Sequence, residues 1–209
     1  GYYEMPSDHI YIRPESWDKP FEAPEHVCSS YDNCHVPWGS THEKTWHLVK
    51  TLPHVSGLFV WTGFDYLGEP TPYWWPSRSS FFGIVDLAGF PKDIYYMYKS
   101  EWTNEPVLHI FPHWNWKEGE PVDIWAYYNN ADEVELYLNG KSLGVRQKTD
   151  STYHVSWRVP FTPGTLKAVS RLGGKEVLVK EIHTAGEPAR LVLTPDRSVI
   201  QADGSDLSF

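Results

Sequence analysis

The alternation of apolar and polar positions divides the chain into a helical region and a region of short strands. In "STHEKTWHLVKTL", residues 40–52, apolar side chains such as Trp46 and Val49 share one face, which predicts a helix. Ser40 and Glu43 have the S-x-x-E spacing of a capping box, in which each side chain bonds a backbone N–H of the first turn. The spacing therefore predicts a helix that begins at Ser40.

A strand and a second helix are predicted next. "GLFVW", residues 57–61, is a short apolar run typical of a buried strand in a parallel sheet covered by helices. "FFGIVD", residues 81–86, is a weaker strand or a turn. "PKDIYYMYKSEW", residues 91–102, predicts a helix with proline near its first turn. Helix, strand, long loop and helix together indicate the end of an α/β architecture.

From Pro106 onward the pattern changes to short alternating segments separated by turn residues. Asn139-Gly140 marks a hairpin, because a type I′ turn needs positive φ at both central positions. Six or seven strands over this length fit an immunoglobulin-like β-sandwich. Residues 187–209 have the pattern of a further β-domain. The expected strands lie in 107–114, 121–129, 133–147, 153–161, 164–174 and 175–186.

Residues 1–39 contain many prolines and have no sustained period, so a long irregular excursion is expected. The segment holds both cysteines of the chain, Cys28 and Cys34. A local disulfide and two free thiols are both compatible with this spacing.

Composition excludes several classes of function. The formal net charge is -9, and the 18 Lys and Arg residues are scattered, so nucleic acid is not an expected partner. No apolar run reaches about 18 residues, so no membrane span is expected. His109 and His113 are separated by Pro112, which argues against a helical ligand pair, and neither a metal nor another cofactor is expected.

Aromatic residues make up 16% of the chain, with 11 Trp and 13 Tyr. One interpretation is a core rich in large rings, which we expect for Trp125 and Trp157 in the alternating strands. The other is a sugar-binding cleft, because pyranose rings present apolar C–H faces that stack on indoles. The stretch "GLFVWTGFDYLGEPTPYWWPSR", residues 57–78, favours the second interpretation, since rings and carboxylates gather where an apolar strand is expected to stop.

The block from "GLFVWTGFDYLGEP" to "KDIYYMYKSEW" resembles the end of the catalytic (β/α)8 barrel in glycoside hydrolase family 2, particularly its β-galactosidase-like members of the Bacteroides type. The W-x3-D step from Trp61 to Asp65, the later "GIVDLAGFPKD" and the upstream "YDNCHVPWGSTHEKTW" carry the resemblance. The resemblance implies that residues 1–105 are the last part of the barrel, that 106–186 form an immunoglobulin-like sandwich, and that 187–209 start a further one.

The resemblance also implies a retaining exo-β-glycosidase with two catalytic glutamates. Neither glutamate has a matching position here, so both are expected upstream of Gly1. Asp65 with Glu69, or Asp32 alone, are less favoured candidates for these roles. The active site of such a barrel lies at the C-terminal ends of its strands.

By the same resemblance, Trp61 forms the floor of the subsite for the cleaved sugar, although a core Trp that caps the barrel is the alternative. Asp65 either accepts sugar hydroxyls or fixes the loop. Asp32 and Arg78 complete the set of candidate substrate-binding residues. Further rim candidates are Trp38, Tyr73, Trp74 and Trp75.

β-Glucuronidases of the family carry an Asn-x-Lys motif that binds the sugar carboxylate. Here the matching positions, 80–82, are Ser-Phe-Phe, so a neutral sugar is favoured. A galactoside is expected, with a mannoside as an alternative.

A non-catalytic carbohydrate-binding or adhesive β-sandwich is the competing class. The partners implied are a carbohydrate substrate and the remainder of the barrel, in a periplasmic or extracellular location; the oligomeric state is left open.

Overall fold

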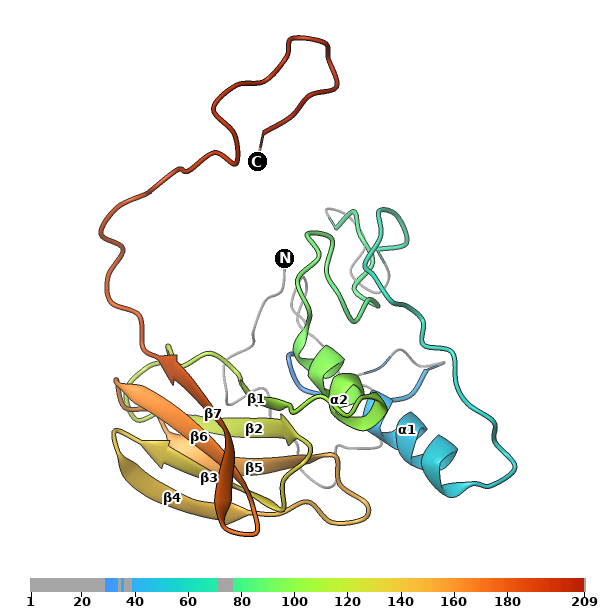
Figure 1. Cartoon of the computed structure of the whole chain (residues 1–209), viewed down its shortest axis with the longest axis vertical. Coiled ribbons are helices and arrows are strands. Elements are labelled where there is room, and N and C mark those ends of the chain that lie inside the picture. The colour runs from blue at the N-terminus through green and yellow to red at the C-terminus, as the bar shows by residue number, and fades with distance from the viewer. Residues whose placement is uncertain (1–28, 34, 36–38, 71–76, 209) are drawn as a thin grey trace.

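The two expected helices are present. The computed structural model shown in Figure 1 describes residues 29–33, 35, 39–70 and 77–208. Helix α1 spans His42–Thr51 and helix α2 spans Asp93–Trp102. The two helices lie beside a β-structure built from the second half of the chain (Figure 1).

The capping box predicted for α1 is wrong. The residue that precedes the helix is Thr41, and its side chain makes no capping hydrogen bond. The first two amides of the helix, those of His42 and Glu43, instead donate to the carboxylate of Asp32 at 2.8 and 2.7 Å. Asp32 therefore takes the capping role expected of the Ser40 side chain, and the Glu43 carboxylate instead contacts Tyr127 and His154.

The buried strand predicted at residues 57–61 is also wrong. This segment has no assigned strand, and the side chains of Phe59 and Trp61 are exposed. A strand persists only where a neighbour satisfies its N–H and C=O groups, and no described segment pairs with 57–61. Pairing begins just after it, where Thr62 to Asp65 lie beside residues 82–85 and Phe64 forms a parallel bridge with Val85.

Each of the six segments between residues 107 and 186 that were expected to hold strands does so. The strands are β1 Leu108–Phe111, β2 Pro121–Tyr128, β3 Glu133–Leu138, β4 Lys141–Arg146, β5 His154–Pro160, β6 Thr165–Leu172 and β7 Lys175–His183. Neighbouring strands are antiparallel, in a three-stranded sheet of order β1-β2-β5 and a four-stranded sheet of order β4-β3-β6-β7. The predicted hairpin at Asn139-Gly140 is confirmed by φ values of 50° and 80°.

The two sheets share an apolar core. Alternate residues of β2, such as Ile124 and Ala126, pack with Leu136 of β3 and Leu166 of β6. Trp157 of β5 belongs to this core, and its indole N–H donates to the carbonyl of Gly144 at 3.1 Å. Alternation along each strand therefore selects the side chains that fill the space between the sheets.

The three-stranded sheet is buried on both faces. The other face of β2 carries Trp125 and Tyr127, which pack with Tyr31, Met97 and Tyr98 of the helical part. Trp125 is therefore buried, as expected, but between the sheet and the helices rather than between the two sheets. This second face explains why β2 is buried at five consecutive positions, 124–128.

Residues 187–208 extend away from the sheets (Figure 1) and contain no assigned strand. Their apolar side chains, including Leu191 and Leu193, are exposed. The assignment of this segment to a further β-domain stays a prediction. Within the described residues, no helix is long and apolar enough to cross a membrane.

Candidate functional site

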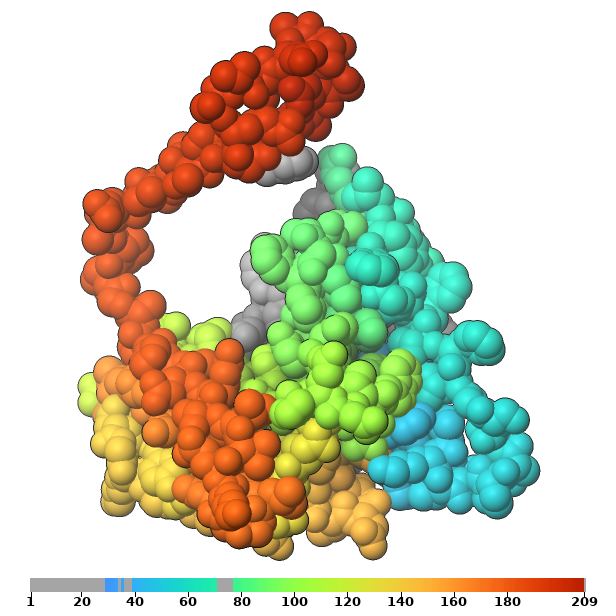
Figure 2. Space-filling view, viewed as in Figure 1, coloured from blue at the N-terminus to red at the C-terminus, as the bar shows by residue number. Residues whose placement is uncertain are grey.

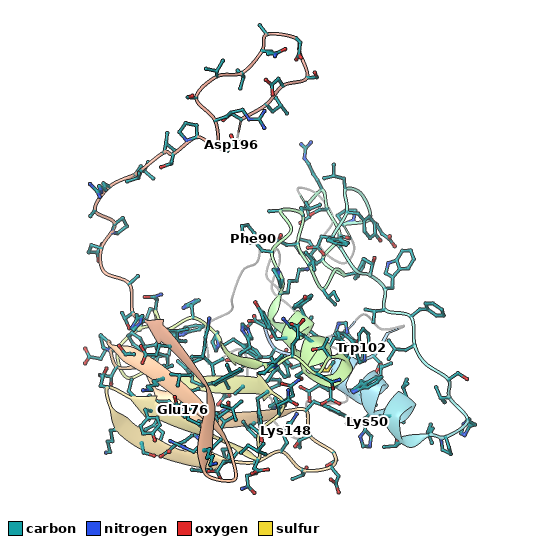
Figure 3. All side chains as sticks on the ribbon, viewed as in Figure 1. Lys50, Phe90, Trp102, Lys148, Glu176 and Asp196 are labelled. Carbon is teal, nitrogen blue, oxygen red and sulfur yellow. The ribbon has the colours of Figure 1, made fainter. Side chains whose placement is uncertain are left out.

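The described residues 57–70 and 77–90 form a lobe above the helices (Figure 2), and several of their large apolar side chains are exposed. Phe90 projects from the loop that precedes α2 (Figure 3). An exposed group of large apolar side chains on one surface often marks a binding or association face. The exposed members are Phe59, Trp61, Phe64, Leu67, Leu87 and Phe90.

Within this lobe, Trp61, Tyr66 and Glu69 are connected by hydrogen bonds; Trp61 and Glu69 are exposed and Tyr66 is half-buried. Trp61 is 72% exposed, and its indole N–H donates to the hydroxyl of Tyr66 at 3.3 Å. The two rings meet edge to face with centroids 6.3 Å apart. The Tyr66 hydroxyl in turn donates to the carboxylate of Glu69, and this bond raises the pKa of the phenol above its usual value. An indole face and a carboxylate acceptor are thus presented side by side.

Backbone geometry places Glu69 at a tight turn. Gly68 and Glu69 both have positive φ, 92° and 46°. The N–H of Gly68 donates to the carbonyl of Arg78 at 2.7 Å, and Leu67 bridges Ser79, so the two sides of the loop are held together at its base. Arg78, a predicted substrate-binding residue, therefore contributes its backbone to the same loop that carries Glu69.

Asp65 precedes Tyr66 in the chain, and only 8% of its side chain is exposed. Its Oδ2 lies 2.8 Å from Nζ of Lys92, and its Oδ1 accepts the N–H of Gly83 at 2.7 Å. Lys92 also donates to the carbonyl of Phe81 at 3.2 Å. Asp65 and Lys92 thus join residues 62–65 to 81–83, which is the loop-fixing role considered for Asp65. The hydroxyl-accepting role stays a prediction.

Gly83 is required where these segments meet. A Cβ at this position would lie 2.1 Å from the backbone nitrogen of Asp65 and 2.4 Å from the carbonyl carbon of Phe64. Backbone atoms cannot move aside as the end of a flexible side chain can. The close approach that lets Asp65 bond the Gly83 amide therefore depends on glycine.

Asp32 is distant in sequence from this lobe and is buried at the start of α1. Burial raises the pKa of its carboxyl above the usual value, while His42 lowers it and Glu43 raises it further. Both oxygens accept helix amides. The structure therefore assigns Asp32 a capping contact, and its predicted contact with substrate is untested.

Several predicted residues fall outside the described part of the chain. They are the rim candidates Trp38, Tyr73, Trp74 and Trp75, and the cysteines Cys28 and Cys34. Among the described residues, no group of three or more His, Cys, Asp or Glu side chains is arranged to hold a metal ion.

Sequence reasoning missed Tyr66 as a link and Lys92 as the partner of Asp65. The signal for Lys92 was available in principle, because a carboxylate next to an apolar strand needs a counter-charge when it is buried. Glu69 was considered only as a catalytic candidate. Its hydrogen bond to Tyr66 and its exposed position make it an acceptor group beside an aromatic face.

Comparisons with known proteins agree on one family. Residues 119–178 match a domain of unknown function, DUF4982. The whole chain is 62% identical over 209 residues to the β-galactosidase BoGH2A of Bacteroides ovatus, of which it covers 25%. It is 38% identical over 206 residues to a putative β-glucuronidase of Formosa agariphila, with 91% of the chain and 19% of that protein covered.

Solved structures give the same picture. A β-glycosidase from Bacteroides vulgatus matches with a TM-score of 0.74 and 34% identity, over 97% of this chain and 25% of that one. A glycosyl hydrolase family 2 member from Bacteroides cellulosilyticus matches with a TM-score of 0.67 and 33% identity, over 79% of this chain and 26% of that one. The chain therefore spans about a fifth to a quarter of the length of these relatives.

Proposed function

The chain belongs to glycoside hydrolase family 2, and we propose that it is part of a retaining exo-β-glycosidase that removes terminal β-galactosides. The observation that carries this proposal is the 62% identity to a β-galactosidase along the entire chain. Similarity of this extent includes both the lobe with the aromatic group and the two sheets. The proposed parent protein is a hydrolase that acts on carbohydrate.

In this proposal residues 1–105 are the last part of a (β/α)8 barrel, 106–186 are an immunoglobulin-like sandwich, and 187–209 start another β-domain. The parallel bridge between Phe64 and Val85 and the seven antiparallel strands support this division. A retaining mechanism needs two carboxyl groups about 5–5.5 Å apart across the glycosidic bond. Both are proposed to lie outside these 209 residues, because neither catalytic glutamate of the family has a matching position in this sequence. Asp65 is not proposed for either role, because its carboxylate is paired with Lys92.

The proposed contribution of this chain is substrate binding. The exposed face of Trp61 packs against the apolar face of the sugar, and Glu69, held by Tyr66, accepts a sugar hydroxyl. Asp65 supports the group through Lys92 rather than through the sugar. Arg78 holds the base of the same loop through its carbonyl.

A β-glucuronide is the second candidate substrate, because relatives named as β-glucuronidases also match. A uronic acid needs a cationic partner, and positions 80–82 are Ser, Phe and Phe. The hydroxyl of Ser80 is fully buried and accepts the N–H of Tyr66 at 3.1 Å. Lys92, the nearby cation, is committed to Asp65. These contacts favour a neutral sugar. Separately, we propose a periplasmic or extracellular location for the protein.

The test uses the full-length protein with nitrophenyl β-galactoside, β-glucuronide and β-mannoside. The proposal predicts that the galactoside is cleaved with the highest kcat/KM and that the isolated 209-residue chain is inactive. Preferential cleavage of the glucuronide would overturn the choice of sugar. A full-length protein that binds sugar without cleaving any glycoside would instead favour a carbohydrate-binding or adhesive sandwich.

A further inference from the structure

The face of the β1-β2-β5 sheet that packs against the helices is rich in aromatic side chains and includes a histidine. Trp125 of β2 and His154 of β5 stack with ring centroids 3.5 Å apart and planes 5° apart. Phe111 of β1 and Tyr127 of β2 stack beside them with centroids 5.3 Å apart. Both β2 and β5 lie in the region that matches a domain of unknown function.

Tyr31 fits into this surface from the helical part. Its ring meets Trp125 edge to face with centroids 5.0 Å apart and lies 5.6 Å from Phe111. Its hydroxyl donates to the backbone carbonyl of Asp123 at 2.5 Å. A ring of this size buried on the sheet, with its hydroxyl satisfied, fixes residues 29–33 against β2.

A polar chain continues from the sheet to the first turn of α1. Oε1 of Glu43 lies 2.7 Å from Nδ1 of His154, and the Tyr127 hydroxyl donates to the same oxygen at 3.2 Å. Burial raises the pKa of Tyr127 well above its usual value, so this hydroxyl remains a donor. The backbone N–H of Glu43 donates to Asp32, which closes the connection from β5 to residues 29–33.

Helix α2 completes this arrangement. Nδ1 of His42 lies 2.8 Å from the hydroxyl of Tyr98, and the two rings meet edge to face. Glu43 and Asp32 are both buried, and a buried carboxylate is strongly destabilising unless charged or hydrogen-bonded partners compensate it. The position of Glu43 is therefore set by a residue 111 positions later in the chain.

We propose that the β1-β2-β5 sheet is an internal docking platform, and that His154, through Glu43, positions the first turn of α1 and residues 29–33. This assigns a role to the region of unknown function, residues 119–178: it packs against the sugar-cleaving part and supports it, and it is not a separate sugar-binding module. His154 is then a positioning residue for catalysis, a consequence that rests on the proposed function. The docking itself does not.

The test compares His154→Phe with His154→Asn in the full-length protein. Phenylalanine keeps a ring on Trp125 but cannot bond Glu43, whereas the asparagine amide can donate near the position of Nδ1. The matched control is Glu135→Gln, because Glu135 pairs with Arg171 at the same 2.7 Å distance but on β3 and β6, away from the helices. Amide hydrogen exchange and steady-state kinetics are measured on all three variants.

His154→Phe is expected to speed exchange of the His42 and Glu43 amides by about tenfold or more, since a buried carboxylate that loses its histidine partner favours local opening even with the Tyr127 hydroxyl still bonded to it. His154→Asn is expected to recover part of this protection, and Glu135→Gln to leave it unchanged. In the same variants kcat falls for His154→Phe with a smaller change in KM. Unchanged exchange in His154→Phe overturns the platform, and raised exchange with wild-type kcat overturns the positioning role. A wild-type protein without glycosidase activity would count against the proposed function alone, because the exchange measurement does not depend on it.

Discussion

Lys92 and Asp65 form a buried ion pair that joins the start of α2 to the segment that carries Trp61. Their charged groups are 2.8 Å apart, and only 10% and 8% of the two side chains are exposed. Removing one partner of such a pair leaves a buried charge without compensation and strongly lowers the free energy of unfolding. Replacing both partners by apolar residues changes the free energy of unfolding much less.

Lys92→Met is therefore expected to lower the free energy of unfolding by about 3–5 kcal/mol. Lys92→Met combined with Asp65→Asn should recover part of this loss, because the buried charge is then gone. The matched control is Lys99→Met, whose partner Glu105 is 70% exposed, and which should cost no more than about 1 kcal/mol. Urea denaturation measures the free energy of unfolding of the three variants. Equal losses for Lys92→Met and Lys99→Met would contradict the prediction that the buried pair stabilises the fold more than the exposed one.

Gly83→Ala tests the close approach of the two paired segments. The added methyl group would meet backbone atoms of Asp65 and Phe64, so the pairing of 62–65 with 82–85 should be lost. We expect faster exchange of the Val85 amide, which donates to Gly63, and a loss of about 1–3 kcal/mol. Gly63→Ala is the control, because nothing lies within 4 Å of a Cβ there. Protection of Val85 that is equal in both variants would contradict the steric explanation.

The strands of the second half could be predicted because each carries its own alternation and turn signals, as at Asn139-Gly140. The conformation of residues 57–61 could not be predicted in this way, because an apolar run forms a strand only when a neighbouring segment pairs with it, and the sequence pattern does not reveal that neighbour. The cap of α1 was missed for a related reason: Asp32 is ten residues from His42 in sequence, outside any local motif. Glu43 and His154 are 111 positions apart, so their contact has no local signal in the sequence.

Glu101 offers a test by pH. Its carboxylate accepts the indole N–H of Trp46 at 2.9 Å and lies 2.8 Å from Nζ of Lys50 and 3.6 Å from Nζ of Lys148; the two lysines are labelled in Figure 3. Burial acts to raise the pKa of Glu101, but hydrogen bonds from Lys50 and Trp46 and the charge of Lys148 lower it below its ordinary value of 4.5.

Because the folded pKa is lowered, Glu101 contributes stability at neutral pH that is lost as the pH falls from about 4.5 through the folded value. Glu101→Gln should therefore be less stable than wild type by about 1–3 kcal/mol at pH 7, and the difference should shrink in acid. Urea denaturation of both proteins between neutral and acid pH measures the difference. A gap that stays constant or widens on acidification would contradict this sign. Glu105→Gln, in which an exposed carboxylate is changed, is the control.

The central claim is that Trp61 provides the surface on which the sugar is held, and kcat/KM of Trp61→Ala in the full-length protein tests it most directly. Loss of this indole should remove roughly 2–4 kcal/mol of transition-state stabilisation, a fall of about 30- to 1000-fold. Trp157→Ala is the comparison, because Trp157 lies between the two sheets and should lower the melting temperature with little change in kcat/KM. Trp125 is unsuitable for this purpose because it stacks on His154. A Trp61→Ala protein with wild-type kcat/KM on the β-galactoside would contradict the claim.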